Sequence, residues 1–195
     1  MKPENDVRAF WTTFAMGALI APTAFLLAGL LSIDLLSLIS PQLAAATTGV
    51  AATAPLIALL IWFMRSQWRP IADFRQSQIK FFSEIGFQFT PLRNALLSIV
   101  AGAGEELMFR GVLQTLAERH FPVLAAIVIP NILFAALHAR TPLYALAAGL
   151  VGIYLGALFS ITGSLAAPII AHGLYDFVAL EWTRRVLIRP SLSHS

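Results

Sequence analysis

Long apolar runs, interrupted only by short polar stretches, constrain this chain more than any other feature of its sequence. Of its 195 residues, 58% are hydrophobic and 12% are charged, whereas soluble globular domains carry about 25% charged residues. So few polar side chains cannot cover a water-soluble globule of this size. Because a membrane-spanning helix needs roughly 20 apolar residues, the sequence has room for about six crossings. We therefore predict a polytopic integral membrane protein.

The apolar runs also predict where the helices lie. About six segments consist of an apolar run that is bounded by residues typical of helix ends. These segments are 10–31, 43–64, 92–116, 122–137, 143–161 and 165–186. In the stretch 65–93, aromatic and aliphatic residues alternate with polar ones, which predicts an amphipathic helix at the membrane interface between spans 2 and 3. The predicted fold is an all-α transmembrane bundle, a single integral membrane domain over residues 1–195, with a disordered tail at 189–195.

The positions of the basic residues predict the orientation in the membrane. If the N-terminus is cytoplasmic and the spans alternate, all Lys and Arg residues except Arg110 and Arg119 fall on the cytoplasmic side, as the positive-inside rule requires. We expect a multi-pass protein of a cell membrane, here a bacterial inner or plasma membrane, with both termini cytoplasmic. The basic residues are spread along the chain, so no nucleic-acid partner is predicted. The absence of cysteine excludes disulfides, thiolate metal sites and a cysteine nucleophile.

Several ionisable side chains fall inside the predicted spans, where each costs several kcal/mol unless it finds a partner or water. They are Glu105, Glu106 and Arg110 in segment 92–116, His138 at the end of segment 122–137, and His172 and Asp176 in segment 165–186. Such residues usually face the interior of a bundle and mark functional sites. We therefore expect these three segments to bring their polar stripes together.

Helical spacing predicts which of these side chains meet. Glu106 and Arg110 are four residues apart and can pair. Glu105 lies about 140° from Arg110 around the helix, so it is the free carboxylate of the two. His172 and Asp176 have the same four-residue spacing and can hydrogen-bond. A further stripe combines an amide, an aromatic ring and an imidazole: Asn131, Phe134 and His138.

Each pair has a purely structural explanation when it is taken alone. A Glu–Arg pair can clamp one helix, and intramembrane His and Asp side chains can simply join neighbouring helices. Two adjacent carboxylates, one of them neutralised by arginine, together with histidines on two other helices are better suited to general acid–base catalysis. Gly149, Gly152 and Gly156 form a small-residue face, which we expect to serve packing only.

The order of three short motifs resembles that of a known protease family. The motifs are Glu-Glu-x-x-x-Arg (Glu105, Glu106, Arg110), Phe-x-x-x-His (Phe134, His138) and His-x-x-x-Asp (His172, Asp176). This order, with each motif on an apolar helix, resembles the CAAX protease and bacteriocin-processing (CPBP, or Abi) family of intramembrane proteases, to which the Ras-converting CAAX prenyl endopeptidase belongs. The resemblance covers residues 92–178.

The resemblance implies a hydrolase that cleaves a peptide bond in a water-filled cavity within the membrane. Glu105 would be the general base with His138 as its partner, while Glu106 and Arg110 would hold the helix and tune the local field. His172 and Asp176 would stabilise the oxyanion, and Asn131 and Phe134 would bind substrate or support these residues. No cofactor is implied. The expected partners are the lipid bilayer and a peptide or protein substrate reached in or at the membrane, such as a peptide pheromone, a bacteriocin leader or a membrane-protein tail.

Two features fit this pattern less simply. Better-studied relatives carry Asn where this chain has Asp176, and an amide can donate to an oxyanion whereas an ionised carboxylate repels it. Asp176 is therefore either protonated by its apolar surroundings or accepts a hydrogen bond from the ring of His172 and orients it; we favour orientation.

The second feature is the depth of Glu105 and His138 in the membrane. Glu105 lies about 20 Å into its helix, whereas His138 lies near the cytoplasmic end of its own, so the third helix must begin below the bilayer core or tilt strongly.

Three other functions are compatible with the sequence. Glu105, His138 and His172 could hold zinc in a metalloprotease site, although metal-free glutamate chemistry is favoured because no His-Glu-x-x-His motif is present. Buried glutamate and histidine could instead relay protons in a transport protein, although inverted repeats and broken helices are not evident. The chain could also be a non-catalytic immunity or scaffold protein, because a fold alone does not guarantee chemistry.

Overall fold

The computed structural model describes residues 3–39 and 43–188, so the predicted disordered tail at 189–195 lies outside the described residues. Every regular element within these ranges is helical and none is a strand, which confirms the all-α prediction. In chain order the elements are α1 (Pro3–Ala18), α2 (Ile20–Leu30), α3 (Leu35–Leu38), α4 (Leu43–Arg65), α5 (Arg69–Ser83), α6 (Pro91–Glu106), the π-helix η1 (Leu107–Gln114), α7 (Thr115–Glu118), α8 (Val123–Leu137), α9 (Pro142–Thr162) and α10 (Ala166–Ile188).

Within the described residues, three stretches of helix are long and apolar enough to cross a membrane: Pro3–Leu30, Leu43–Arg65 and Pro142–Thr162. They correspond to the first, second and fifth predicted spans. The fourth is the shorter apolar helix Val123–Leu137. The third and sixth are present as the continuous helix from α6 through α7 and as α10. A helix therefore exists at every predicted span within the described residues, and three of the six are long and apolar enough to cross a membrane. Six crossings of the bilayer stay a prediction.

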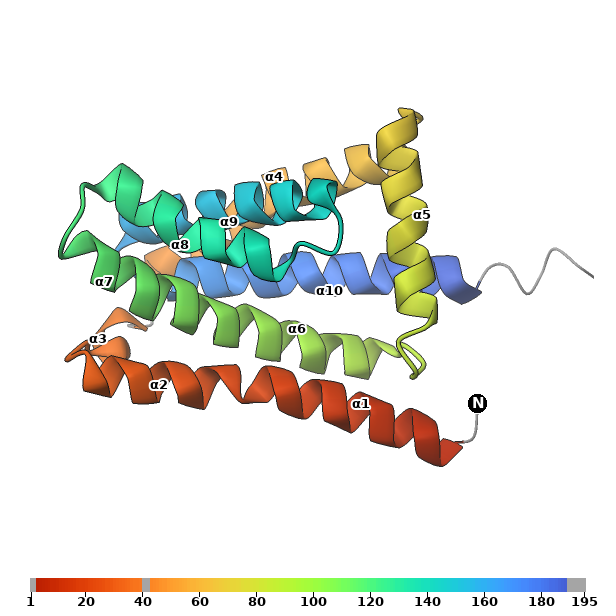
Figure 1. Cartoon of the computed structure of the whole chain (residues 1–195), viewed down its shortest axis with the longest axis horizontal. Helices are drawn as coiled ribbons and strands as arrows, with labels where there is room; N and C mark the ends of the chain where they lie inside the picture. The colour runs from red at the N-terminus through yellow and green to blue at the C-terminus, as the bar shows by residue number, and fades with distance from the viewer. Residues whose placement is uncertain (1–2, 40–42, 189–195) are drawn as a thin grey trace, which may run out of the picture.

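The long helices lie side by side along one axis and alternate in direction, with α10 packed against both α4 and α6 (Figure 1). Glycines allow this close packing. A Cβ on Gly102 of α6 would lie 2.8 Å from the backbone nitrogen of Gly173 in α10, and a Cβ on Gly49 of α4 would lie 2.6 Å from the carbonyl oxygen of Ala167. Small residues at helix crossings are typical of membrane bundles. They let α10 hold its polar residues close to both neighbours.

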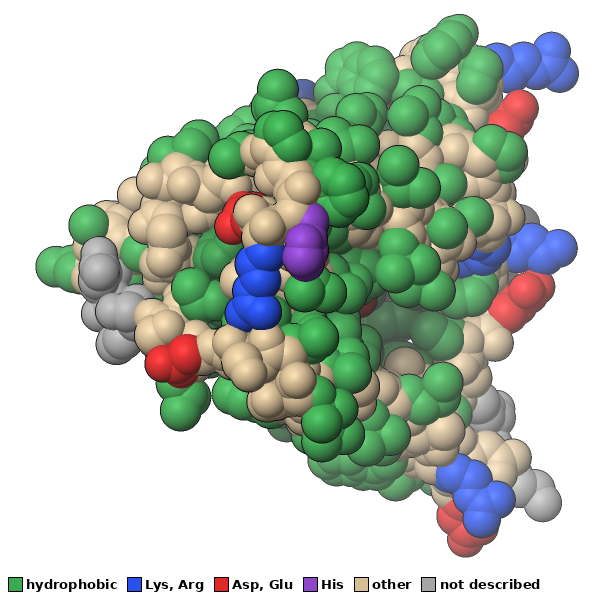
Figure 2. Space-filling model, turned by 60° about the vertical axis from the view of Figure 1, so that its left-hand side comes forward, with side chains coloured by type: hydrophobic (Ala, Val, Ile, Leu, Met, Phe, Trp, Pro, Cys, Tyr) green, Lys and Arg blue, Asp and Glu red, His purple; other side chains and the backbone are tan. Residues whose placement is uncertain are grey.

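Much of the surface of the bundle is apolar. Hydrophobic side chains make up a large part of the face in Figure 2, in which the end that bears the connection between α7 and α8 is turned forward. Large apolar side chains such as Leu30, Leu124 and Ile161 are exposed. A soluble monomer rarely exposes an apolar surface this extensive, so the outer face of the bundle suits hydrocarbon better than water.

The amphipathic segment expected between spans 2 and 3 is present as α5. This helix crosses the bundle at a steep angle to the long helices (Figure 1). It buries Ile71 and Phe74. Its Arg75 donates Nη1 to the carbonyl oxygens of Phe63 and Ser66, both at 3.0 Å, at the end of α4. These carbonyls have no partner within the helix, so the arginine caps α4 and fixes α5 beside it.

Two of the helices that carry polar residues begin with the same sequence device. Thr90 and Thr141 each precede a proline at the first helical position. Their hydroxyls accept hydrogen bonds from the backbone N–H groups of Arg93 at 3.2 Å and Tyr144 at 3.1 Å, respectively. A threonine N-cap followed by proline is a strong helix start. The caps thus fix where α6 and α9 begin and where the residues of their first turns lie.

Candidate active site

The helix that carries the Glu-Glu-x-x-x-Arg motif changes its pitch within the motif. After α6 ends at Glu106, residues 107–114 form η1, and the N–H of Thr115 bonds to the carbonyl of Arg110, five residues earlier. Turns of this kind are rare and occur often at functional sites. Glu106, Arg110 and Gln114 follow one another at steps of four along this part of the helix, and all three side chains are fully buried.

The guanidinium of Arg110 is held by three elements of the bundle. Its Nη1 donates to Oε1 of Glu106 at 3.1 Å, which confirms the predicted pair. Its Nη2 donates to Oδ1 of Asn131 in α8 at 3.0 Å and to the carbonyl oxygen of Gly152 in α9 at 2.5 Å. The ring of Phe134 lies 5.3 Å from the guanidinium carbon. Charge-assisted hydrogen bonds of this kind are stronger than neutral ones, and they offset part of the cost of burying the charge.

The small-residue face of α9 does more than pack. The Gly152 carbonyl accepts from Arg110, and the Gly156 carbonyl accepts from Nε2 of Gln114 at 3.1 Å. A Cβ on Gly152 would lie 3.0 Å from Cγ of Asn131 and 3.2 Å from Nη2 of Arg110. A side chain there would therefore displace the arginine or its partner. The expectation that these glycines serve packing only is wrong for Gly152 and Gly156, because their backbones are hydrogen-bond acceptors.

His172 connects the three carboxylates of the cluster. Its Nδ1–H donates to Oε1 of Glu106 at 2.8 Å, the same oxygen that accepts from Arg110. Its Nε2 lies 3.5 Å from Oδ2 of Asp176 and 3.9 Å from Oε2 of Glu105. The predicted approach of His172 and Asp176 is confirmed. Glu106 makes the shorter contact, however, so Glu106 orients the ring and leaves the second nitrogen facing Glu105 and Asp176.

His138 follows the last residue of α8 and lies on the predicted stripe. Its ring centre is 4.3 Å from that of Phe134, and its Nδ1–H donates to the Phe134 carbonyl oxygen at 2.8 Å. This hydrogen bond leaves Nε2 as the nitrogen that can accept a proton. His138 also interacts electrostatically with Asp176. No hydrogen bond or ion pair joins His138 to Glu105 among the described residues, so their partnership stays a prediction.

The length of α8 accounts for the depth of His138. The helix has 15 residues, too few for a full crossing. Along the long axis of the bundle, its connection to α9 stops short of the C-terminal end of α10 (Figure 1). His138 is therefore inside the length of the bundle rather than at its end.

The structure adds Gln114 to the residues expected at the site. Its Nε2 donates to Oγ of Ser160 at 2.9 Å and to Oε1 of Glu118 at 3.1 Å. It thereby extends the buried stripe from Glu106 and Arg110 towards the surface at α7. The sequence contained a signal for this, because Glu106, Arg110, Gln114 and Glu118 follow one another at steps of four along one helix.

A metal site receives no support from this arrangement. Within the described residues, no group of three or more His, Asp or Glu side chains has an arrangement that could hold a metal ion. Glu105, His138 and His172, the set considered for zinc, are therefore not assembled as ligands here. A zinc site would require these side chains to rearrange.

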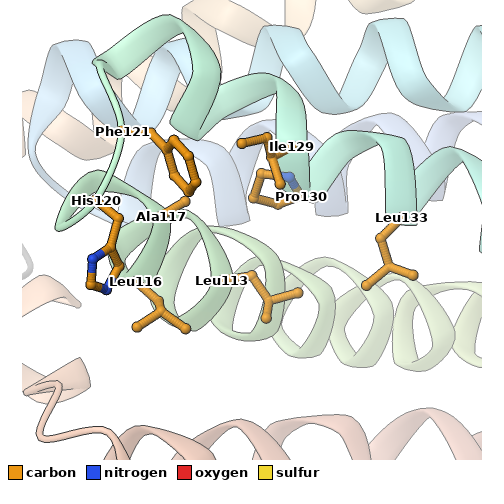
Figure 3. Close-up of a pocket in the computed structure, with 8 residues that line it drawn as sticks. All are labelled: Leu113, Leu116, Ala117, His120, Phe121, Ile129, Pro130 and Leu133. Carbon is orange, nitrogen blue, oxygen red and sulfur yellow. The ribbon is translucent and has the colours of Figure 1, made fainter.

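The structure also contains an apolar cavity of about 320 Å³ between η1, α7 and α8 (Figure 3). The cavity is lined by Leu113, Leu116, Ala117, His120, Phe121, Ile129, Pro130 and Leu133. None of the residues in the polar cluster borders it. The cavity is therefore separate from the candidate site.

The fold and the cluster together define an all-helical domain of membrane-protein character, with carboxylates, histidines and an arginine gathered in its interior. Residues 87–178 match the family described as type II CAAX prenyl endopeptidase, Rce1-like, and this part of the chain is a domain of that family. The matched region includes every residue of the cluster, from Glu105 to Asp176. No curated protein and no solved structure matches the chain.

Proposed function

We propose that this protein is an intramembrane endopeptidase that hydrolyses a peptide bond with a water molecule activated by Glu105 and histidine. The observation that carries the proposal is the buried cluster in which Glu106 connects Arg110 to His172, while Glu105 faces the other nitrogen of the same ring. Ionisable groups that are buried and brought together from separate helices are typical of sites that carry out general acid–base catalysis. The family of residues 87–178 supports a peptide as the substrate.

The geometry suits activation of water by Glu105. The distance of 3.9 Å between Oε2 of Glu105 and Nε2 of His172 is too long for a direct hydrogen bond. A water molecule can bridge polar groups that are separated in this way. Glu105 would take a proton from this water while the water oxygen attacks the peptide carbonyl. It would return the proton to the amide nitrogen when the carbon–nitrogen bond breaks.

The other members of the cluster are proposed to position these reacting groups. Glu106 is held by Arg110 and in turn orients His172. Asn131 and Phe134 hold the guanidinium through a hydrogen bond and a ring contact. Fixed charges of this kind need no rearrangement during the reaction, so they can favour the charge that develops in the transition state.

Quantitative mass spectrometry of membrane peptides tests the proposal without a known substrate. Cells that produce the wild-type protein are compared with cells that produce Glu105→Gln, which keeps the shape of the side chain but removes its basicity. Glu84→Gln, at an exposed position after α5, is the matched control. We expect products that are present with wild type and Glu84→Gln and absent with Glu105→Gln.

The same experiment separates the competing functions. If the peptides do not depend on Glu105, the chain is not a protease of this type, and transport or a scaffold function takes precedence. Treating isolated membranes with a strong chelator tests zinc. Product formation that survives chelation supports metal-free chemistry, whereas its loss and recovery with added zinc would contradict the proposal.

We further propose that the protein crosses the membrane with both termini and the end that bears α5 in the cytoplasm. The natural chain has no cysteine, so single-cysteine variants report accessibility without background. Ser83 and Phe121 are exposed, one at the end of α5 and the other between α7 and α8. An impermeant maleimide should label Phe121→Cys in intact cells and Ser83→Cys only after permeabilisation. The reverse pattern would invert the topology.

A further inference from the structure

The candidate site lacks donors for the charge that peptide hydrolysis creates. When water adds to a peptide carbonyl, the carbonyl oxygen becomes an oxyanion that must accept hydrogen bonds. Both terminal nitrogens of Arg110 already donate within the bundle, and Nδ1 of His172 already donates to Glu106. Asp176 is a carboxylate where an amide could have donated. Among the described residues, two nitrogens of these groups take part in no hydrogen bond: Nε of Arg110, which is fully buried, and Nε2 of His172, which faces Glu105 and Asp176.

The hydroxyl of Tyr144 lies in the same region and is not engaged. Tyr144 comes from the first turn of α9, and its ring packs edge-on against that of His138. No hydrogen bond is found for this hydroxyl within the ranges that the structure describes. By contrast, the hydroxyl of Tyr154, later in the same helix, donates to the carbonyl oxygen of Ala52 at 2.8 Å. Tyr144 therefore offers a donor that is not already used.

The ring of Tyr144 is fixed from several sides. Its centre lies 5.7 Å from that of His138, at an interplanar angle of 76°, and 5.9 Å from that of Phe74 in α5. The guanidinium carbon of Arg140 lies 5.4 Å from the ring centre. The backbone N–H of Tyr144 donates to the Thr141 cap at 3.1 Å. A donor held in this way is preorganised, which oxyanion stabilisation requires.

These ring contacts explain an aromatic residue at this position but not a hydroxyl. A phenylalanine would make the same contacts with His138 and Phe74. The hydroxyl adds nothing to these contacts and has no hydrogen-bond partner among the described residues, so it can donate to a group that arrives with the substrate. Resting on the proposed function, we propose that Tyr144 is a catalytic residue whose hydroxyl donates a hydrogen bond to the oxyanion formed when water adds to the peptide carbonyl.

The proposed step balances without any additional reactant. Glu105 accepts the proton of the attacking water, and the electron pair of the carbonyl double bond moves to oxygen. Tyr144 keeps its proton and shares it in a hydrogen bond with that oxygen. When the double bond re-forms, the carbon–nitrogen bond breaks and the proton on Glu105 passes to the leaving amine.

The test compares Tyr144→Phe with Tyr154→Phe, an identical change in the same helix. A Glu105-dependent cleavage site is first identified by peptide mass spectrometry, and a synthetic peptide that spans it is assayed with purified protein in liposomes. Loss of one oxyanion donor lowers kcat by about 100-fold or more. We expect this loss for Tyr144→Phe, with KM unchanged within about twofold because the hydroxyl acts in the transition state. Tyr154→Phe should keep the wild-type kcat.

Several outcomes would overturn the assignment. If Tyr144→Phe cleaves at the wild-type rate while Glu105→Gln is inactive, the proposed protease stands and the role of Tyr144 falls. The same holds if Tyr144→Phe raises KM alone, or if Tyr175→Phe, next to Asp176, causes the loss of kcat instead. If no Glu105-dependent cleavage is found, the proposed function fails and this inference fails with it. Thermal unfolding of each variant in detergent checks that any loss of kcat is not caused by unfolding.

Discussion

Substituting Gly152 by alanine tests whether the backbone of α9 is part of the buried arginine site. The new Cβ would lie 3.0 Å from Cγ of Asn131 and 3.2 Å from Nη2 of Arg110. Neither neighbour can move freely, because Nη2 is bonded to both the Gly152 carbonyl and Asn131, while Nδ2 of Asn131 donates to the carbonyl of Ile127 at 2.7 Å. Either the arginine loses a partner or α9 moves away.

The magnitude follows from these two alternatives. Losing one hydrogen bond to a buried charged group costs about 1.5–3 kcal/mol, and forcing an extra methyl group into a packed interior costs about 1–3 kcal/mol. We therefore expect Gly152→Ala to lower the free energy of unfolding by about 3 kcal/mol. For a chain of this length, that corresponds to a fall in Tm of roughly 6–12 °C.

Thermal unfolding in detergent micelles measures this effect, with two other glycines as graded controls. A Cβ on Gly149, one turn earlier in α9, would meet Ala135 at 3.1 Å, and a Cβ on Gly29 in α2 would meet nothing within 4 Å. We expect a smaller loss for Gly149→Ala and no loss for Gly29→Ala, because alanine favours helix over glycine. If Gly152→Ala unfolds at the same temperature as Gly29→Ala, the close contact between α9 and the arginine is wrong.

Three further predictions concern other parts of the molecule. Arg110→Met should lower the free energy of unfolding by about 3–5 kcal/mol, because it leaves Glu106 buried without its cation. The double variant Glu106→Gln/Arg110→Met should lose less than the sum of the two single variants. Additive losses in the same unfolding assay would show that the two residues are not coupled. Asp176→Asn should cleave at least as fast as wild type, because an amide can donate to an oxyanion. Asp176→Leu should cleave more slowly. If product mass spectrometry shows equal losses of activity for both variants, the carboxylate itself is required. Arg140→Ala should raise the rate of hydrogen exchange in α5, with the free energy of local opening lowered by about 1 kcal/mol. The reason is that Arg140 donates a hydrogen bond to Gln78 and that its guanidinium carbon lies 3.8 Å from the ring centre of Phe81. Unchanged exchange in α5 would show that these contacts do not hold the helix.

The positions of the helices could be predicted from the sequence because apolar runs and their end signals are local. Thr90 and Thr141, each followed by proline, mark helix starts that need no tertiary information. The pairing of Glu106 with Arg110 was predictable for the same reason, since both lie on one helix. Pairings within one helix follow from spacing alone.

Contacts between helices were less accessible to sequence reasoning. The bond from His172 to Glu106 depends on how α10 lies against α6, which no local spacing determines. The Gly152 carbonyl could not be recognised as a partner of Arg110, because backbone acceptors leave no sequence signature. The π-turn that follows Glu106 was likewise hidden, since its residues read as an ordinary apolar helix.

The π-turn η1 also joins two halves of one helix that pack against different neighbours. In a uniform α-helix each residue advances by about 100°, so a change of register in one half rotates every side chain of the other. Here the half before Glu106 packs on α10 through Gly102, while the half after it directs Arg110 and Gln114 towards α9. Glu106, at the junction of the two halves, contacts both sides, because its Oε1 accepts from Arg110 and from His172 of α10. One continuous helix therefore ties α10 to α9 through the arginine, so a shift of α10 against α6 would be felt at the Gly152 carbonyl.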